Sequence, residues 1–503
     1  MLKYRQFSFA TVNTAMKFSN TYSQLDGAFY QRISPEQVSR PQLLLWNDEL
    51  AGWLQLTEEF CRDRALLAQY FSGNRLPDGA DPIALAYAGH QFGSFNPQLG
   101  DGRAHLLGEV LSGNGQRYDI QLKGSGQTLF SRQGDGKCAL GPAVREYIMS
   151  EAMFALGVPT SRCLAVVATG EPVFRETAKP GAVVTRVAAS HIRVGTFEYF
   201  AARGDLGSLK TLADFTISRH FPDIAGNPEL DNEEKILHLL QAVINKQISL
   251  IVSWLRVGFI HGVMNTDNTA ISGETIDFGP CAMMGIYHPG TVFSSIDTRG
   301  RYAFGNQAAI GQWNMARLAE ALLPLIDAVP EKAVARAEPL IRQFSRDFDL
   351  AYRQMLANKL GMATADEQST ALANGLLTQM QEQELDYTQT FARLTLSLKD
   401  AGLTQQLGQE LGPWYDSWRT LLADNAITPA RAKSLMAQNN PQVIPRNHHV
   451  EAILQDYEQN GGSDSINDFL TVLRSPYRLL PQTEKFQDLP ADGDRHYRTF
   501  CGT

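Results

Sequence analysis

The sequence predicts an α+β protein with a small β-rich lobe followed by a large helical lobe. Residues 84 to 200 are rich in glycine and in β-forming residues arranged in short apolar runs. From about Leu206 onward, apolar residues recur mainly at helical spacing. The chain of 503 residues is too long for one small core, so we expect two lobes with a ligand cleft between them.

Composition excludes several classes of protein. The formal net charge of −8 argues against a general nucleic-acid binder, because neutralising phosphates needs a basic surface. The apolar stretch from Ile236 to Ile260 is interrupted by polar residues, so we expect a buried amphipathic helix and no membrane partner. Residues 1 to 18 lack the apolar core of a secretory signal, which indicates a cytoplasmic location.

Five segments are expected along the chain. They are an N-terminal extension at 1–83, the β-rich lobe at 84–205, a helical catalytic core at 206–330, a helical C-terminal extension at 331–474, and a tail at 475–503. Helical spacing is also clear within the first segment, from Pro41 to Phe71.

Local patterns predict the elements of the β-rich lobe. Asn114-Gly115 indicates a hairpin turn, because Asn-Gly tolerates positive φ. A helix is expected from Pro142 to Leu156, since proline suits a first turn and Gly157 ends the pattern. The predicted strands are Ala104–Leu111, Tyr118–Leu122, Leu164–Thr169 and Ala182–Val187. In the helical part, the segment from His261 to Gly305 is predicted to be rich in loops.

Lys123 and Glu146 have the spacing of an ATP-binding pair. Lys123 ends an apolar β run, and Glu146 lies 23 residues later on the expected helix. Protein kinases hold a strand lysine with a helix glutamate so that the ammonium group meets nucleotide phosphates. A lysine leaving a strand is more often a solvated surface charge, so this pair alone does not decide the function.

Two motifs in the loop-rich segment extend the pattern. The string His261-Gly262-Val263-Met264-Asn265-Thr266-Asp267-Asn268 has the length and ends of a kinase catalytic loop. Asn268 falls on the metal-binding asparagine, and Asp277-Phe278-Gly279 matches the metal-binding Asp-Phe-Gly motif nine residues later. These motifs in this order indicate a kinase-like nucleotide site.

The usual catalytic aspartate of such a loop is absent. Val263 takes its place and cannot accept a proton, which leaves Asp267 as the only carboxylate in the loop. Asp267 is either a general base for an incoming hydroxyl or an extra acceptor near the metal ions, and a loop-capping role is a third interpretation. The residues alone leave the transferred group open.

Two glycine-rich loops and two arginines of the β-rich lobe supply candidate phosphate contacts. Glycines let the backbone approach a ligand closely, and an arginine can form two hydrogen bonds with a phosphate. Each charge by itself is more often exposed to solvent, but together they suit a deeply buried triphosphate. The candidates are Gly100, Gly102, Arg103, Asp135, Gly136, Arg186 and Arg193.

Assembled, these residues resemble the selenoprotein O family, kinase-fold proteins that act as protein AMPylators. The resemblance covers nearly the whole chain and implies a protein-kinase-like two-lobed fold with N- and C-terminal extensions. Cys501 stands where eukaryotic members carry selenocysteine, as in bacterial members. The strings that carry the resemblance are Tyr87–Gly93, Gln98–Ala104, Gln121–Gly126, Asn265–Asn268, Asp277–Pro280 and Ile444–His448.

The resemblance implies transfer of AMP from ATP to Ser, Thr or Tyr hydroxyls of proteins, with release of pyrophosphate. ATP is expected in a reversed orientation relative to a kinase, with its γ-phosphate on Arg186 and Arg193. UMP transfer from UTP with Mn²⁺ is also implied for bacterial members.

The resemblance also implies roles for the other candidates. Lys123, paired with Glu146, is expected to contact phosphate, and Asn268 and Asp277 to bind Mg²⁺ or Mn²⁺. Asp267 is expected to accept the proton. Nucleotide-lining residues are expected to be Gly100, Gly102, Arg103, Asp135 and Gly136, and a redox pair is expected between Cys281 and Cys501.

Two other functions stay open on the sequence. One is an ATP-dependent phosphotransferase that uses Asp267 as a displaced base. The other is a non-catalytic pseudokinase that binds nucleotide and scaffolds a partner. The presence of the lysine, the glutamate and both metal ligands disfavours the pseudokinase.

Overall fold

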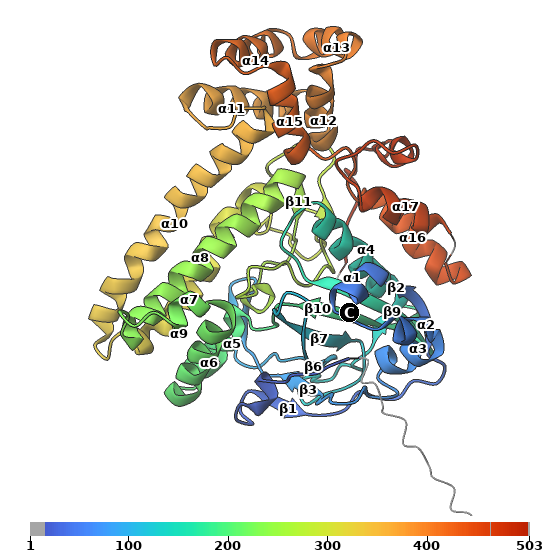
Figure 1. Cartoon of the computed structure of the whole chain (residues 1–503), viewed down its shortest axis with the longest axis vertical. Helices are drawn as coiled ribbons and strands as arrows, with labels where there is room; N and C mark the ends of the chain where they lie inside the picture. The colour runs from blue at the N-terminus through green and yellow to red at the C-terminus, as the bar shows by residue number, and fades with distance from the viewer. Residues whose placement is uncertain (1–15, 463, 501–503) are drawn as a thin grey trace, which may run out of the picture.

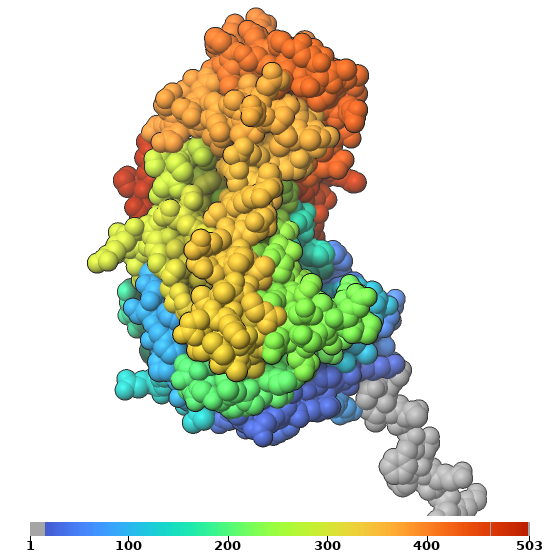
Figure 2. All heavy atoms as spheres, turned by 90° about the vertical axis from the view of Figure 1, so that its left-hand side faces the viewer, coloured from blue at the N-terminus to red at the C-terminus, as the bar shows by residue number. Residues whose placement is uncertain are grey.

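A computed structural model describes residues 16–462 and 464–500 of the chain. One antiparallel sheet lies in the first half of the sequence, and helices form most of the second half (Figure 1). The predicted α+β class is confirmed. Figure 2 shows helix α10 (Pro330–Lys359) along the outside of the molecule, leading to the helices that follow it at one end.

The main sheet has eight strands among the described residues. Their hydrogen-bonded order is β1-β3-β6-β7-β10-β9-β2, with β8 paired to β10, and all these pairings are antiparallel. The bounds are β1 Tyr30–Arg32, β2 Gln42–Trp46, β3 Ile83–Leu85, β6 Ala104–Leu111, β7 Arg117–Lys123, β8 Cys138–Ala139, β9 Arg162–Phe174 and β10 Ala178–Ala188.

The four predicted strands are confirmed. The first has the predicted bounds as β6, and the other three lie within β7, β9 and β10. The predicted turn at Asn114-Gly115 joins β6 to β7, and Gly115 has a φ of 78°, a conformation that glycine adopts without steric cost.

The prediction of a helix starting at Pro41 was wrong for its first residues. Gln42–Trp46 forms β2 at one edge of the sheet and pairs with β9. The run Leu43-Leu44-Leu45 is short and apolar, and such a run does not distinguish a strand from a helix by periodicity. Helices follow it at α1 (Asp48–Trp53), α2 (Glu58–Arg62) and α3 (Arg64–Ser72). Together with β1, β2 therefore brings part of the first 83 residues into the sheet.

Helix α4 (Leu140–Ala155) packs against the sheet and confirms the helix predicted from Pro142. Its side chains contact β9 and β10 on one side and α16 (Asn447–Asn460) on another, so nearly all of its residues are buried. Gly157 ends the helix in a left-handed conformation, with a φ of 72°. Burial on several sides fixes the rotation of α4 and so the direction in which Glu146 points.

Helix α8 (Asn232–Val257) is the central helix of the second half. Asp231 and Glu234 form a capping box at its start, and Gly258 ends it with a φ of 78°. Among the described residues, α8 is the one helix long and apolar enough to cross a membrane by length and composition. Half of its most apolar stretch is buried, because α8 packs against α10 and α9 (Gln307–Ile326).

Two short strands close the loop-rich segment that follows α8. β11 (Phe259–Ile260) pairs with β12 (Ala282–Met283), so the intervening loop starts and ends at neighbouring points. This loop contains a 3₁₀ helix, Thr266–Asn268. The β11–β12 loop therefore presents the two predicted metal-binding motifs from one short stretch of structure.

The other described elements complete the chain. A loop of residues 440–446 separates α15 from α16, and α17 ends at Leu473. The remaining bounds are β4 Gly89–Gln91, β5 Ser94–Asn96, α5 Val194–Ala201, α6 Leu206–His220, α7 Pro222–Ala225, α11 Glu367–Glu382, α12 Tyr387–Ser397, α13 Ala401–Leu411, α14 Pro413–Asp424, α15 Pro429–Asn439 and α17 Ser465–Leu473, with 3₁₀ helices Tyr22–Gln24, Phe304–Asn306 and Thr483–Phe486.

Candidate active site

A cleft of about 1120 Å³ is enclosed by the sheet, its loops and the β11–β12 loop. The sheet side contributes mainly cations and glycines, and the β11–β12 loop contributes carboxylates and an amide. The cleft brings together Gly100, Gly102, Arg103, Lys123, Asp135, Gly136, Arg186, Arg193, Asp267, Asn268 and Asp277.

Lys123 and Arg186 project from the same face of the sheet. In the pairing of β7 with β10, Arg186 lies opposite Gln121, two residues before Lys123. Because side chains alternate along a strand, residues at this spacing share a face. Both cations therefore reach Glu146 on α4 and Asp277 on the β11–β12 loop.

These four side chains form one buried charge network. Lys123 Nζ donates to Glu146 Oε2 at 2.8 Å and to Asp277 Oδ1 at 2.9 Å. Arg186 donates from Nε to Glu146 Oε1 and from Nη2 to Asp277 Oδ1 at 3.4 Å. The network confirms the expected contact between Lys123 and Glu146 and joins the sheet directly to the Asp-Phe-Gly motif.

The network keeps both carboxylates ionised. Burial alone raises the pKa of Glu146, but Arg186 and Lys123 outweigh it and hold that pKa below its usual range. Burial also opposes ionisation of Asp277, but Lys123, Arg186 and Arg103 hold its pKa far below the usual value. Asp277 also has a φ of 64°, a left-handed conformation uncommon outside glycine. Such backbone strain is typical of functional loops.

Asp267 lies in the 3₁₀ helix of the β11–β12 loop with its two oxygens in different environments. Gln91 Nε2 donates to Oδ2 at 3.1 Å, whereas Oδ1 is buried without a hydrogen-bond partner among the described residues. Burial raises the pKa of Asp267 to about 6, although Gln91 and Arg193 both act to lower it. A carboxyl group that lines the cleft and has such a pKa is suited to accept a proton near neutral pH.

A network from the β4–β5 hairpin holds this loop in place. The backbone N–H of His90 donates to Thr266 Oγ1 at 2.7 Å, and Thr266 Oγ1 donates to Glu198 Oε2 at 2.5 Å. His90 Nδ1 lies 2.5 Å from Glu198 Oε1. Glu198 on α5 therefore positions both Gln91 and Asp267, the chain neighbours of His90 and Thr266.

Arg193 links the sheet side of the cleft to the β11–β12 loop. Its Nη1 donates to the backbone carbonyl of Asp267 at 3.3 Å, and its Nη2 lies 3.5 Å from Asp101 Oδ1. The guanidinium group also stacks over the ring of Tyr87 at 4.1 Å. Arg193 is buried yet lines the cleft, which presents a fixed cation at the inner wall.

Most of the sequence matches a known family. A family model described as protein adenylyltransferase SelO matches residues 12–474. The chain belongs to the SelO family. It is 52% identical to a protein nucleotidyltransferase YdiU of Teredinibacter turnerae, over 97% of this chain and 100% of the relative. Proteins of the same name from Rhizobium leguminosarum and Bacillus cereus are 50% and 49% identical, each over 97% of this chain and at least 98% of the relative.

Membership confirms the family expected from the sequence motifs, and the family is one of protein nucleotidyltransferases. In this SelO chain, close packing requires glycine in the first glycine-rich loop, which contains Gly100 and Gly102. A Cβ on Gly100 would lie 2.2 Å from Cγ of Phe130, and one on Gly102 would lie 2.7 Å from the carbonyl oxygen of Phe130. The two glycines therefore let the loop lie directly against residue 130 at the edge of the cleft.

The second glycine-rich loop, which contains Asp135 and Gly136, carries an ion pair that was not predicted from the sequence. Arg175 donates to both oxygens of Asp135, at 2.8 Å from Nη1 and 3.1 Å from Nη2. Gly136 has a φ of 70°, and a Cβ there would lie 2.2 Å from the carbonyl carbon of Gly126. Asp135 thus orders the loop through Arg175, which also lines the cleft.

Asn268 and Arg103, the other two cleft residues predicted from the sequence, make few side-chain hydrogen bonds with described residues. Asn268 donates from Nδ2 to the carbonyl of Val263 at 3.1 Å, so the orientation of its amide group is set by this hydrogen bond.

Val263 is buried in the place of the usual aspartate. Arg103 is half-buried, lines the cleft and acts to lower the pKa of Asp277.

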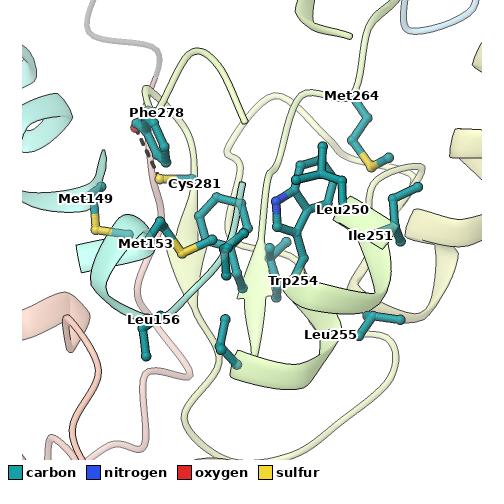
Figure 3. Close-up of a cluster of buried hydrophobic side chains, with 14 of the residues drawn as sticks. Met149, Met153, Leu156, Leu250, Ile251, Trp254, Leu255, Met264, Phe278 and Cys281 are labelled. Carbon is teal, nitrogen blue, oxygen red and sulfur yellow. Dashed lines mark hydrogen bonds between the residues drawn. The ribbon is translucent and has the colours of Figure 1, made fainter. Parts of the chain in front are cut away.

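Cys281 is enclosed in an apolar cluster behind the Asp-Phe-Gly motif (Figure 3). Its thiol donates to the carbonyl of Phe278 at 3.2 Å, and Met149 and Met153 of α4 and Trp254 of α8 belong to the same buried cluster. Burial raises the pKa of the Cys281 thiol to about 12, which disfavours the reactive thiolate. Its expected partner, Cys501, lies outside the described residues. Thr499 does reach this region, since its Oγ1 donates to Pro280 O at 2.7 Å.

Proposed function

We propose that the chain transfers AMP from ATP to Ser, Thr or Tyr hydroxyls of other proteins. The observation that carries this proposal is the carboxyl group of Asp267, which lines the same cleft as the charge network around Asp277. Asp267 accepts the proton as the hydroxyl oxygen attacks the α-phosphorus. The new P–O bond forms while the bond to the β-phosphate oxygen breaks, and pyrophosphate leaves.

Asn268 and Asp277 are the residues suited to hold Mg²⁺ or Mn²⁺. Amide and carboxylate oxygens are the ligand type of these ions. Lys123 and Arg186 both contact Oδ1 of Asp277, which leaves Oδ2 outside the ion pairs, and the amide nitrogen of Asn268 is already engaged with Val263. A bound ion supplies charge neutralisation at the phosphates.

The cations of the sheet side are suited to hold the triphosphate. Lys123 is fixed by Glu146, and Arg186 and Arg193 are both buried at the cleft wall. We infer that the γ-phosphate lies against these two arginines, which leaves the α-phosphate facing Asp267. The nucleotide would further contact Gly100, Gly102, Arg103, Asp135 and Gly136.

The proposal also covers the fold, the location, the partners, a second activity and a redox pair of the protein. It comprises a protein-kinase-like two-lobed fold with lobes at 84–205 and 206–330, followed by the segments 331–474 and 475–503. The expected N-terminal extension at 1–83 contributes β1 and β2 to the sheet of the first lobe. The proposal further comprises a cytoplasmic location without nucleic-acid or membrane partners, a second activity with UTP, and the redox pair Cys281 and Cys501. The approach of Thr499 to Pro280 supports the pair.

Position-specific labelling of the nucleotide tests the activity. With a mixture of bacterial proteins as acceptors, ATP labelled at the α-phosphate should label protein, and ATP labelled at the γ-phosphate should not. α-Labelled UTP with Mn²⁺ tests UMP transfer in the same assay. Label from the γ-phosphate would support a phosphotransferase, and ATP binding without any labelling would support a pseudokinase; either result would overturn the proposal.

The pH profile tests the role of Asp267. A general base acts only when it is deprotonated, so activity should be present above pH 6 and fall as the pH drops through about 6, the pKa to which burial raises Asp267. The slope should approach tenfold per pH unit on the acid side, measured as the initial rate of label incorporation at saturating ATP. Glu146 and Asp277 stay ionised over this range, because their cation partners lower their pKa values.

A further inference from the structure

We propose that His448, His449 and Asp488 form a second metal site that binds a divalent transition-metal ion of the Zn²⁺ class. The three residues lie outside the nucleotide cleft, in the first turn of α16 and in the segment that follows the 3₁₀ helix Thr483–Phe486. One ligand atom from each lies within 4.8 Å of the other two. This inference does not depend on the proposed transfer activity.

Both imidazoles face the same carboxylate. His449 Nε2 lies 2.8 Å from Asp488 Oδ1, and His448 Nε2 lies 3.4 Å from Asp488 Oδ2. In a tetrahedral zinc site with bonds of about 2.0–2.1 Å, neighbouring ligand atoms are separated by roughly 3.3 Å. The distance from each imidazole nitrogen to the carboxylate is therefore already near the spacing that such an ion requires.

His448 has unsatisfied ring nitrogens in this arrangement. Among the described residues, neither Nδ1 nor Nε2 of its ring makes a hydrogen bond, although both atoms are shielded from solvent. Buried polar atoms are nearly always paired, so an unpaired imidazole nitrogen aimed at a carboxylate needs an explanation. A metal ion between Nε2 of His448 and Asp488 provides one for that nitrogen.

The chemistry of the ligand set selects the class of ion. Two imidazole nitrogens and one carboxylate suit Zn²⁺ and its first-row neighbours, whereas Mg²⁺ and Ca²⁺ prefer sites made only of oxygen. The side chain of Asp488 is 60% exposed, which leaves room for water at the remaining coordination position. The site is thus chemically distinct from the oxygen-only pair Asn268 and Asp277.

Hydrogen bonds of Arg446 and Asn447, the two residues just before the histidines, fix the position of the site. Arg446 donates to Asp386 Oδ2 at 2.6 Å and to the carbonyl of Gln487 at 3.0 Å, next to Asp488. Asn447 exchanges two hydrogen bonds with the backbone of Met283 in β12, at 2.9 and 3.0 Å. The segment Ile444–His448 therefore connects α16 to the tail and to β12. This structural role accounts for these residues, which do not line the nucleotide cleft.

An ion at this site would cross-link α16 to the tail. Asp488 lies 39 and 40 positions after the two histidines, and β12, which contacts Asn447, begins three residues after the Asp-Phe-Gly motif. Metal that binds only the folded arrangement stabilises it by mass action. Zinc should therefore raise the thermal stability of the chain and slow proteolysis of the segment around Asp488.

Calorimetry on the full-length, untagged chain tests the site. Zn²⁺ is titrated in the presence of excess Mg²⁺, with Asp277→Asn as a background in which the active-site ligand is lost. We expect one Zn²⁺ per chain in both backgrounds. His449→Gln and Asp488→Asn should each weaken binding by at least about tenfold, since even an outer hydrogen-bond partner of a metal ligand contributes that much. His496→Gln, an exposed histidine of the same tail, is the matched control and should bind normally.

Cobalt gives an independent measure of the ligands. Co²⁺ in a site of low coordination number has strong visible absorption, which should appear in the unaltered chain and in His496→Gln but not in Asp488→Asn. Absence of stoichiometric Zn²⁺ binding would overturn the proposal. So would binding that Asp488→Asn leaves unchanged, or binding that is lost in Asp277→Asn, because the ion would then belong to the nucleotide cleft.

Discussion

Replacing Asp277 with asparagine is expected to reduce nucleotidyl transfer by about a thousandfold or more. The change removes the anion that contacts Lys123 and Arg186 and that is proposed to hold the metal ion. Metal-based charge stabilisation contributes several kcal/mol, and about 4 kcal/mol corresponds to a factor of a thousand in rate. Single-turnover incorporation from α-labelled ATP measures the effect.

Binding of ATP separates this loss from misfolding. Lys123 and Arg186 keep Glu146 as a partner in the variant, so the fold and the phosphate-binding cations should persist. Asp223→Asn, an exposed aspartate on α7, is the matched control and should retain the full rate. A variant Asp277→Asn that kept more than a tenth of the activity would show that Asp277 does not hold a catalytic ion.

Replacing Asp267 with asparagine is expected to reduce the rate by about 10²- to 10⁴-fold, the usual contribution of a general base. Asparagine has nearly the same shape and still accepts a hydrogen bond from Gln91, but it does not take up the proton of the acceptor hydroxyl. Nucleotide and metal affinities should stay close to those of the unaltered chain. The measurement is the rate of α-label incorporation together with the dissociation constant of ATP.

The same variant distinguishes the three roles that the sequence leaves open for Asp267. A general base predicts a large loss of rate, and the remaining activity should no longer fall near pH 6. An extra acceptor near the metal ions predicts weaker metal binding. A loop cap predicts lower thermal stability with an unchanged rate at low temperature. Either of the last two results would remove Asp267 as the base.

The sequence predicted elements whose cause is local. Strand β6 is a largely apolar run, interrupted by His105, Gly108 and Glu109 and followed by a turn. Helix α4 has a proline in its first turn and a glycine after its end, so neighbouring residues determine both elements. Lys123, Glu146, Asn268 and Asp277 were predicted because their types and order follow a known chemical pattern. The structure places these four residues close together, as the pattern predicts. Their roles in binding phosphate and metal ions stay predictions.

Other features depend on partners distant in the chain. Gln91 contacts Asp267 across 176 positions, and Glu198 contacts Thr266 across 68, so no local pattern relates them. Arg175 was missed because a single arginine after a strand resembles an ordinary surface charge. Strand β2 was assigned to a helix for a related reason. Its pairing with β9 is long-range, and its short apolar sequence fits a strand or a helix equally well.

The network of Lys123, Arg186, Glu146 and Asp277 is electroneutral, with two cations and two anions in contact. A triphosphate entering without its counter-ion would add a large negative charge beside two carboxylates, and a divalent cation entering alone would meet two fixed cations. Binding of each is therefore favourable mainly in the presence of the other. Because such coupling is reciprocal, the affinity for nucleotide should rise with the concentration of divalent cation by the same factor as the affinity for cation rises with nucleotide.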